Sequence, residues 1–113
     1  MKDHFKEKVM HRDLKPANIG IHFSGKTFED NKERDEFIRL FDFEKDRKTL
    51  HVKIFDYGQA KKLKKEDKAN SIVGTNGYRA PELLKNDLNR ISGKRMDGYT
   101  FKVDVWSCGI IFY

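Results

Sequence analysis

The stretch HRDLKPAN, residues 11–18, brings a carboxylate, a cation and an amide close together in the chain. Asp13 can accept a proton, Lys15 carries a positive charge, and Asn18 offers a neutral oxygen ligand. Phosphoryl transfer uses these groups, because the attacking hydroxyl is deprotonated, charge on the transferred group is neutralised, and Mg²⁺ prefers hard oxygen ligands. A charged surface turn is the alternative for so short a stretch. The stretches that follow it decide between the two.

Three further short stretches follow this one in a fixed order. They are DYG at 56–58, GTNGYRAPE at 74–82 and DVWSCG at 104–109. Together with HRDLKPAN they resemble the eukaryotic protein kinase family, in order its catalytic loop, its magnesium-binding DFG turn, its APE segment and the DxWxxG helix of its large lobe. The resemblance covers the chain apart from two polar insertions.

The resemblance implies a role for each matching residue. Asp13 corresponds to the catalytic base, Lys15 to the lysine that contacts the transferring phosphate, and Asn18 and Asp56 to the magnesium ligands. ATP and Mg²⁺ are the implied cofactors, and a protein hydroxyl is the implied acceptor. Lys15 favours serine/threonine specificity, because tyrosine kinases typically have an alanine-arginine pattern there. Thr75 resembles the threonine that bridges the aspartate and the lysine, with an ordinary turn threonine as the alternative.

The resemblance also implies regulation through the segment before APE. Arg12 precedes the base, and kinases with this arginine commonly use it to hold a phosphate on the activation loop, since a guanidinium binds phosphate oxygens bidentately. Ser71 lies where the family often has its activating phosphosite, which an upstream kinase would modify. Lys61 lies where a second basic partner for the phosphate is found. An unmodified loop serine is the alternative reading of Ser71.

Four more residues have structural roles in the family. His11 and Tyr57 resemble members of the hydrophobic column that links the two lobes. Asp104 would be costly in an apolar helix unless hydrogen-bonded, and the family uses it to hold the catalytic-loop backbone. Glu82 is expected to pair with an arginine that lies beyond this chain. The segment 103–113 is apolar on nearly every side, which predicts a buried helix.

The expected fold class is α+β: a partial kinase large lobe over residues 1–113, made of a β-hairpin, an activation segment at 56–82 and the buried helix. Alternating apolar residues predict that strands at 19–23 and 50–54 pair as the hairpin. The polar segment 24–49 reads as an insertion at its tip. A solvated insertion is favoured, and the alternative is a short amphipathic helix, suggested by the spacing of Phe37, Leu40 and Phe41 with Asp30 or Asn31 as its cap.

Loops and one short helix are expected after the hairpin. The basic stretch KKLKKEDKANS at 61–71 has no periodic pattern and reads as a loop. A short helix is expected around Leu83 and Leu84, followed by a polar loop at 86–98. In the last helix, Trp106 and Cys108 are expected to be core residues.

Composition limits the class of protein. Charged residues make up 37% of the chain and the formal net charge is +6. The most apolar stretch is shorter than the ~18 residues that span a bilayer, and the N-terminus MKDHFKEK lacks the apolar region of a secretory signal. A single cysteine fits a reducing compartment, so an intracellular location, cytoplasmic or nuclear, and no membrane partner are expected.

The chain also departs from the family pattern. It has no glycine-rich loop, strand lysine or helix glutamate, so no small lobe is expected in this chain and the isolated chain is expected to be inactive. Residues 19–55 separate Asn18 from Asp56, where the family usually has about a dozen residues. Gly20 replaces the large apolar residue that the family places beneath the adenine ring, which would weaken ATP binding.

Two other functional readings stay open. One is a non-catalytic kinase-like fragment that binds and regulates a complete kinase. The other is a nucleic-acid-binding module, which rests only on charge, lacks interleaved aromatic residues and is therefore not expected. His4, His22 and His51 show no metal-ligand spacing, so no zinc site is expected.

Overall fold

The computed structural model describes residues 8–64 and 67–113, which belong to two compact units. The first unit is formed by residues up to Asn18 together with residues 56–113, and the second by residues 19–55. Short helices and two-stranded sheets make up the secondary structure, which confirms the α+β class. No helix in the described ranges has the length and apolar character to cross a bilayer.

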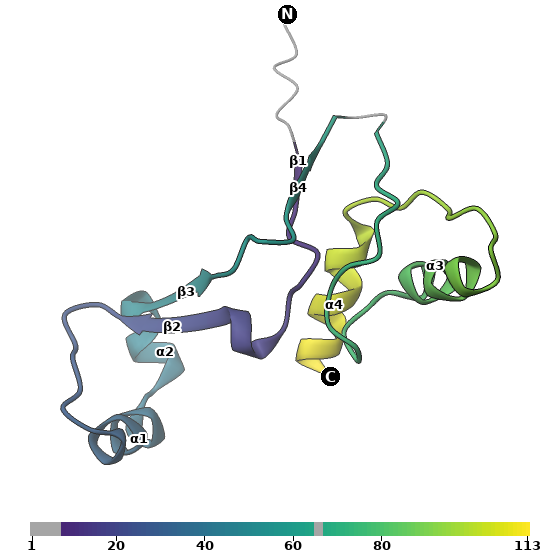
Figure 1. Ribbon diagram of the computed structural model, residues 1–113. Helices are drawn as coiled ribbons and strands as arrows, with labels where there is room; N and C mark the ends of the chain where they lie inside the picture. The colour runs from purple at the N-terminus through teal and green to yellow at the C-terminus, as the bar shows by residue number, and fades with distance from the viewer. Residues whose placement is uncertain (1–7, 65–66) are drawn as a thin grey trace, which may run out of the picture. The chain divides into compact units, whose positions relative to one another are not determined.

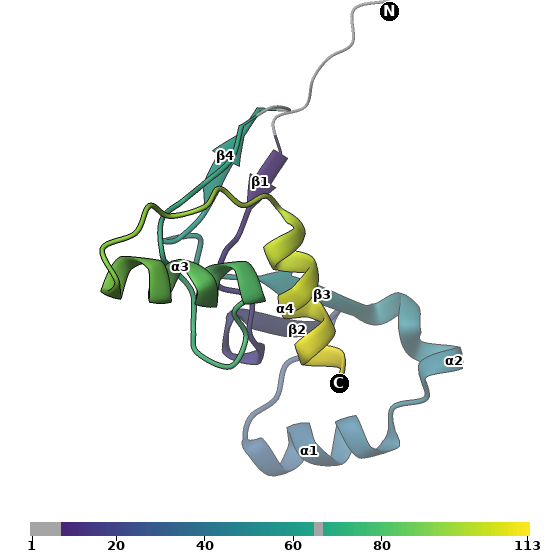
Figure 2. The ribbon, with the colours of Figure 1, turned by 90° about the vertical axis from the view of Figure 1, so that its right-hand side faces the viewer.

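The first unit contains a small sheet and two helices (Figure 1). Strand β1 (Lys8–Met10) pairs antiparallel with β4 (Lys61–Leu63). The helices are α3 (Pro81–Ile91) and α4 (Lys102–Phe112), and they lie near each other in both views (Figure 2). The loop predicted over 61–71 is therefore wrong for its first three residues. Their strand depends on a distant partner, β1, and pairing over such a distance leaves no local sequence pattern.

One hydrophobic core joins the elements of the first unit. Met10 of β1 is fully buried, and Leu83 of α3 and Val103 of α4 are each 2% exposed. The remaining members come from β4 and from the segments that precede the two helices: Leu63, Ala69, Ala80 and Tyr99. Burial of this apolar surface holds strand β1, which leads into the stretch HRDLKPAN, against both helices.

Helix α3 is longer than the sequence suggests. It begins at Pro81, a residue favoured in the first turn, and continues to Ile91 through part of the expected polar loop. The polar residues there make tertiary contacts. The Asn86 side chain is fully buried and exchanges two 2.8 Å hydrogen bonds with the backbone of Asp97. The polar residue Asn86, which suggested a loop in the sequence, thus belongs to the helix and binds the loop that follows it.

Helix α4 confirms the predicted helix, but its predicted burial is wrong in this chain. Only Val103 and Ser107 are buried on it. Val105 is 64% exposed and Trp106 is 46% exposed, so Trp106 is not a core residue, and Cys108 is half-buried. A helix that is apolar all round needs cover on every side, and the described residues cover one side.

The second unit confirms the predicted hairpin. Strand β2 (Ile19–Phe23) pairs antiparallel with β3 (Leu50–Ile54), with Ile19 opposite Ile54 and Phe23 opposite Leu50. The ring of Phe55 lies against Gly20 and occupies the space into which a side chain at position 20 would extend. Gly20 is therefore matched to a bulky neighbour within its own unit.

The insertion at the hairpin tip is folded. It forms α1 (Asn31–Leu40), α2 (Phe43–Asp46) and a 3₁₀ turn, η2 (Arg47–Thr49). The Asp30 carboxylate caps α1 by accepting from the Glu33 N–H at 2.8 Å. The helix of the alternative reading is thus present, but none of its residues is buried and Leu40 is 71% exposed, so the insertion is both helical and solvated. An aromatic cluster gives the insertion its own apolar contacts: Phe23, Phe28, Phe37 and Phe41, with ring centroids 4.9–6.3 Å apart.

Candidate active site

The loop HRDLKPAN is held in place by helix α4. The backbone N–H groups of His11 and Arg12 donate to the two carboxylate oxygens of Asp104, at 2.7 and 2.8 Å. Arg12 has a φ of +70°, a left-handed conformation that is costly for a residue with a side chain. The two charge-assisted hydrogen bonds stabilise this conformation. Asp104 therefore makes the backbone contact that the family resemblance implies.

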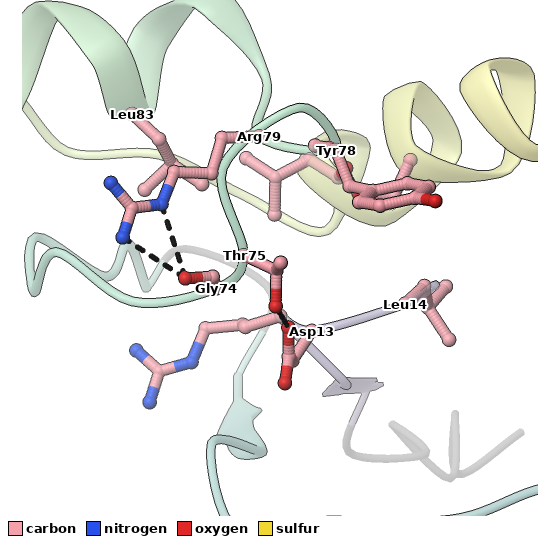
Figure 3. Close-up of a pocket in the computed structure, with 10 residues that line it drawn as sticks. Asp13, Leu14, Gly74, Thr75, Tyr78, Arg79 and Leu83 are labelled. Carbon is pink, nitrogen blue, oxygen red and sulfur yellow. Dashed lines mark hydrogen bonds between the residues drawn. The ribbon is translucent and has the colours of Figure 1, made fainter. Parts of the chain in front are cut away.

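Asp13 and Lys15 are connected through the hydroxyl of Thr75. The Lys15 ammonium donates to Thr75 Oγ1 at 2.8 Å, and the same hydroxyl donates to Asp13 Oδ1 at 2.5 Å. Figure 3 shows the Thr75 hydroxyl directed at the Asp13 carboxylate. Lys15 Nζ also lies 3.8 Å from Asp13 Oδ2. The structure thus brings these three residues together, although Thr75 is far from the other two in sequence.

The side chain of Asn18 is held by hydrogen bonds to Asp13. It ends the 3₁₀ turn η1 (Pro16–Asn18) and is 7% exposed. Its amide nitrogen donates to the Asp13 carbonyl at 2.9 Å and to Asp13 Oδ2 at 3.3 Å. Because both partners are acceptors, the amide orientation is determined, and the oxygen Oδ1 is the side-chain atom that could serve as a metal ligand.

Asp56 also has an unusual backbone. Its φ is +57°, and within the described ranges it shares a positive φ with only one other non-glycine residue, Arg12. Its Oδ1 accepts from the Gly58 N–H at 3.2 Å, and the residue is exposed. An exposed carboxylate and the Asn18 amide oxygen are hard oxygen donors, so the donor set fits Mg²⁺.

The segment after Gly74 approaches the catalytic loop closely. Gly74 has a φ of +94°, and a Cβ at this position would lie 2.7 Å from the Arg12 carbonyl oxygen. The Arg79 guanidinium donates to the Gly74 carbonyl through two nitrogens, at 3.2 and 3.0 Å (Figure 3). It also pairs with Asp87 at 2.7 Å. The close approach of Gly74 to the Arg12 carbonyl brings Thr75, the next residue, within hydrogen-bonding distance of Asp13. The residues around Thr75 line a small cavity of about 10 Å³, at the lower limit of the volume that one water molecule needs.

Comparison with known proteins places this arrangement in a family. Residues 2–113 match the protein kinase domain family. The chain belongs to the protein kinase family. It is 34% identical over 107 residues to the DNA damage response protein kinase DUN1 of Saccharomyces cerevisiae, a match that covers 95% of this chain and 18% of the relative.

Of two other relatives, one is named as a probable serine/threonine-protein kinase and the other as the catalytic chain of a kinase. The probable serine/threonine-protein kinase fhkD of Dictyostelium discoideum is 33% identical, over 93% of this chain and 12% of its own length. The human phosphorylase b kinase gamma catalytic chain, liver/testis isoform, is 30% identical, over 93% of this chain and 19% of its own length. The chain therefore spans less than a fifth of these relatives.

In this kinase chain, Arg12 is connected to the segment around Ser71. The guanidinium of Arg12 donates to the Gln59 carbonyl and to the Tyr99 hydroxyl, the latter at 3.2 Å. The Tyr99 hydroxyl in turn donates to the Ser71 carbonyl at 2.5 Å. Lys61 is an exposed residue of β4, opposite Met10 in the sheet register. Ser71 is exposed and thus open to modification.

The remaining predicted residues have mixed surroundings. His11 is 5% exposed, and its ring packs edge-on against Tyr57 with centroids 5.0 Å apart. Its Nδ1 accepts from the Asp13 N–H at 3.2 Å. Glu82 has no ion-pair partner among residues 8–64 and 67–113, and its expected pairing with an arginine stays a prediction.

Sequence reasoning missed two residues of this kinase site, Arg79 and Tyr99. Arg79 stands inside the APE stretch, and a cation next to an apolar helix start requires partners, which was a usable signal. Tyr99 is 3% exposed and exchanges backbone hydrogen bonds with Ala69 at 2.9 and 2.7 Å. No sequence pattern connects positions 69 and 99, so this contact was not accessible from sequence.

Proposed function

We propose that this chain carries the catalytic loop and activation segment of a protein serine/threonine kinase, which transfers a phosphoryl group from ATP to a protein hydroxyl with Mg²⁺. The supporting observation is the hydrogen-bonded connection of Asp13, Thr75 and Lys15. It holds a carboxylate and a cation side by side in fixed orientation, as phosphoryl transfer requires.

Each residue has a defined task in this proposal. Asp13 accepts the proton of the acceptor hydroxyl, and its orientation is fixed by Thr75 and by the Asn18 amide. Lys15 supplies positive charge where negative charge accumulates on the transferred group. Asn18 and Asp56 would hold Mg²⁺, which supplies charge neutralisation for the phosphates when bound.

Regulation by phosphorylation of Ser71 is part of the proposal. The Ser71 carbonyl is already connected to Arg12 through the Tyr99 hydroxyl. A phosphate on Ser71, added by an upstream kinase, would offer Arg12 a stronger, dianionic partner, with Lys61 as a second cation. The setting we propose is intracellular, because Cys108 has no second cysteine in the chain with which to form a disulfide.

The metal and acceptor assignments are tested in a chimera. The segment of yeast DUN1 that this chain matches over 107 residues is replaced by the corresponding segment of this chain. The proposal predicts Mg²⁺-dependent transfer from ATP to serine and threonine peptides and little transfer to tyrosine peptides. Asn18→Ala is expected to raise the Mg²⁺ concentration needed for half-maximal rate, since it removes one ligand oxygen.

A matched control separates the metal effect from a general loss of activity. Asn31→Ala, at the exposed start of α1 in the other unit, removes a similar amide that matches no kinase motif and should leave the Mg²⁺ dependence unchanged. Equal Mg²⁺ dependence in the Asn18→Ala and parent chimeras would contradict the assignment of Asn18 as a metal ligand.

A further inference from the structure

Two histidines that are distant in sequence meet on the β2–β3 hairpin. In the strand register His22 lies directly opposite His51, and both side chains are exposed. Side chains of directly opposed residues in an antiparallel pair are on the same face of the sheet. The spacing of the histidines in the sequence argued against a metal site, but strand pairing brings the two imidazoles together.

The separation of the two rings suits a shared metal ion. Their centroids are 6.2 Å apart, with an angle of 71° between the ring planes. A zinc ion lies about 2.0–2.1 Å from an imidazole nitrogen, so two imidazoles on one ion have ring centres about 5–6 Å apart. Small side-chain rotations, open to exposed rings, cover the difference.

Ser24 orients one of the two imidazoles. Its hydroxyl oxygen lies 2.7 Å from Nε2 of His51. When Nε2–H donates to this hydroxyl, Nδ1 carries the lone pair and becomes the ligand atom. A hydrogen bond to the second ring nitrogen is the usual support of a metal-bound histidine. Ser24 is itself held by its backbone N–H, which donates to the Thr49 carbonyl at 2.8 Å.

We propose that His22 and His51 form a binding site for a divalent transition-metal ion of the zinc type, with Ser24 orienting His51. Imidazole nitrogen suits Zn²⁺, Cu²⁺ and Ni²⁺ better than Mg²⁺. Within the described ranges no three side chains of His, Cys, Asp or Glu come together. The site therefore has two protein ligands, and water completes the coordination shell.

The surroundings set the expected strength of this site. The hairpin is preorganised by its strand pairing, which reduces the entropy lost when the ion binds. Lys53 lies two residues from His51, on the same face of β3, and its charge opposes a bound cation. The site is thus an exchangeable one. It is independent of the proposed kinase activity, because it needs neither ATP nor the catalytic loop.

The test is calorimetric titration of the full chain with ZnCl₂ under reducing conditions. One ion per chain is expected. His22→Gln and His51→Gln should each weaken binding at least about tenfold, and Ser24→Ala should weaken it less than either of them. Both histidines are exposed, so glutamine at either position removes no buried contact. His4→Gln and Cys108→Ser are the matched controls and should bind as the parent chain does.

A second readout identifies the ligands directly. On addition of zinc, the imidazole NMR resonances of His22 and His51 should shift together, with those of His11 unmoved. The proposal is overturned if the parent chain binds no zinc, if both glutamine variants bind as tightly as the parent, or if binding is lost in Cys108→Ser instead.

Discussion

The hydroxyl of Thr75 is the atom through which Asp13 and Lys15 are connected, which makes position 75 a sensitive probe at the residue scale. In the chimera, Thr75→Val keeps the side-chain shape but removes the hydroxyl, so Asp13 and Lys15 lose their shared partner. We expect a reduction of at least about tenfold in the transfer rate, and Thr75→Ser should restore most of it. Steady-state kinetics of the two variants check this, and equal rates for valine and threonine would contradict the bridge.

A second residue-scale prediction concerns the close approach of Gly74 to the catalytic loop. Gly74 and Gly77 both have positive φ values, +94° and +90°. Alanine at either position costs about 1–2 kcal/mol for this conformation. Gly74→Ala must in addition displace the Arg12 carbonyl, whereas the Cβ of Gly77→Ala meets no atom within 4 Å.

Urea unfolding of the two alanine variants measures the difference. Gly74→Ala is expected to lower the free energy of unfolding more than Gly77→Ala does. Equal losses in the free energy of unfolding would show that the Gly74 segment can move away from the Arg12 carbonyl without cost, which would contradict the prediction.

At this scale, the motifs predicted the types of residue at the site and, through the family resemblance, two long-range contacts: the Thr75 bridge and the hydrogen bonds of Asp104 to the loop backbone. Asp13, Lys15 and Asn18 lie within one short stretch, so local spacing alone brought them together. Arg79 and Tyr99 were missed, since their partners depend on how distant segments pack. Those contacts could be identified only from the three-dimensional structure.

Helix α3 and the loop after it provide a prediction at the scale of elements. Asn86 satisfies both backbone groups of Asp97, so Asn86→Ala should lower the free energy of unfolding by about 1–3 kcal/mol. Lys85→Ala, the neighbouring control, removes only an exposed ion pair with Asp97 at 2.9 Å. Urea unfolding checks the pair, and equal stability of Asn86→Ala and the parent would contradict the role of Asn86.

The Lys85–Asp97 pair gives a pH dependence with a defined sign. The hydrogen bond from Lys85, and its charge, lower the pKa of Asp97 below 3.8, and Asp97 raises the pKa of Lys85 above 10.5. The contribution of the pair is therefore present at neutral pH and is lost as pH falls through the lowered pKa of Asp97 or rises through the raised pKa of Lys85.

The measurement compares the parent with Lys85→Gln at pH 7 and in acid below the lowered pKa of Asp97. Any stability difference at pH 7 should vanish in acid. A difference that persists unchanged in acid would contradict this assignment.

Elements with local patterns were predicted well, and those that rest on distant partners were not. The hairpin was predicted from alternation in both strands. Strand β4 was missed because its partner β1 is far away in sequence, and the extent of α3 was underestimated because its polar residues read as loop.

At the scale of the whole molecule, the uncovered side of α4 dominates behaviour in solution. Val105 and Phe112 are 64% and 87% exposed, and Ile110 is 38% exposed. Contiguous exposed apolar surface favours association, so the isolated chain should self-associate. Val105→Glu with Ile110→Glu should reduce this, and light scattering measures it. A monomeric parent chain at high concentration would contradict the prediction.

The central claim is that Asp13 acts as the catalytic base, and the single-turnover rate of phosphoryl transfer in the DUN1 chimera tests it most directly. We predict that Asp13→Asn lowers this rate by about 100-fold or more while ATP binding is retained. Asp35→Asn, on the exposed face of α1, should leave the rate unchanged. A chimera that folds and binds ATP but transfers at the same rate with asparagine at position 13 would contradict the account. A folded, ATP-binding chimera without any transfer would favour a non-catalytic, regulatory kinase-like chain.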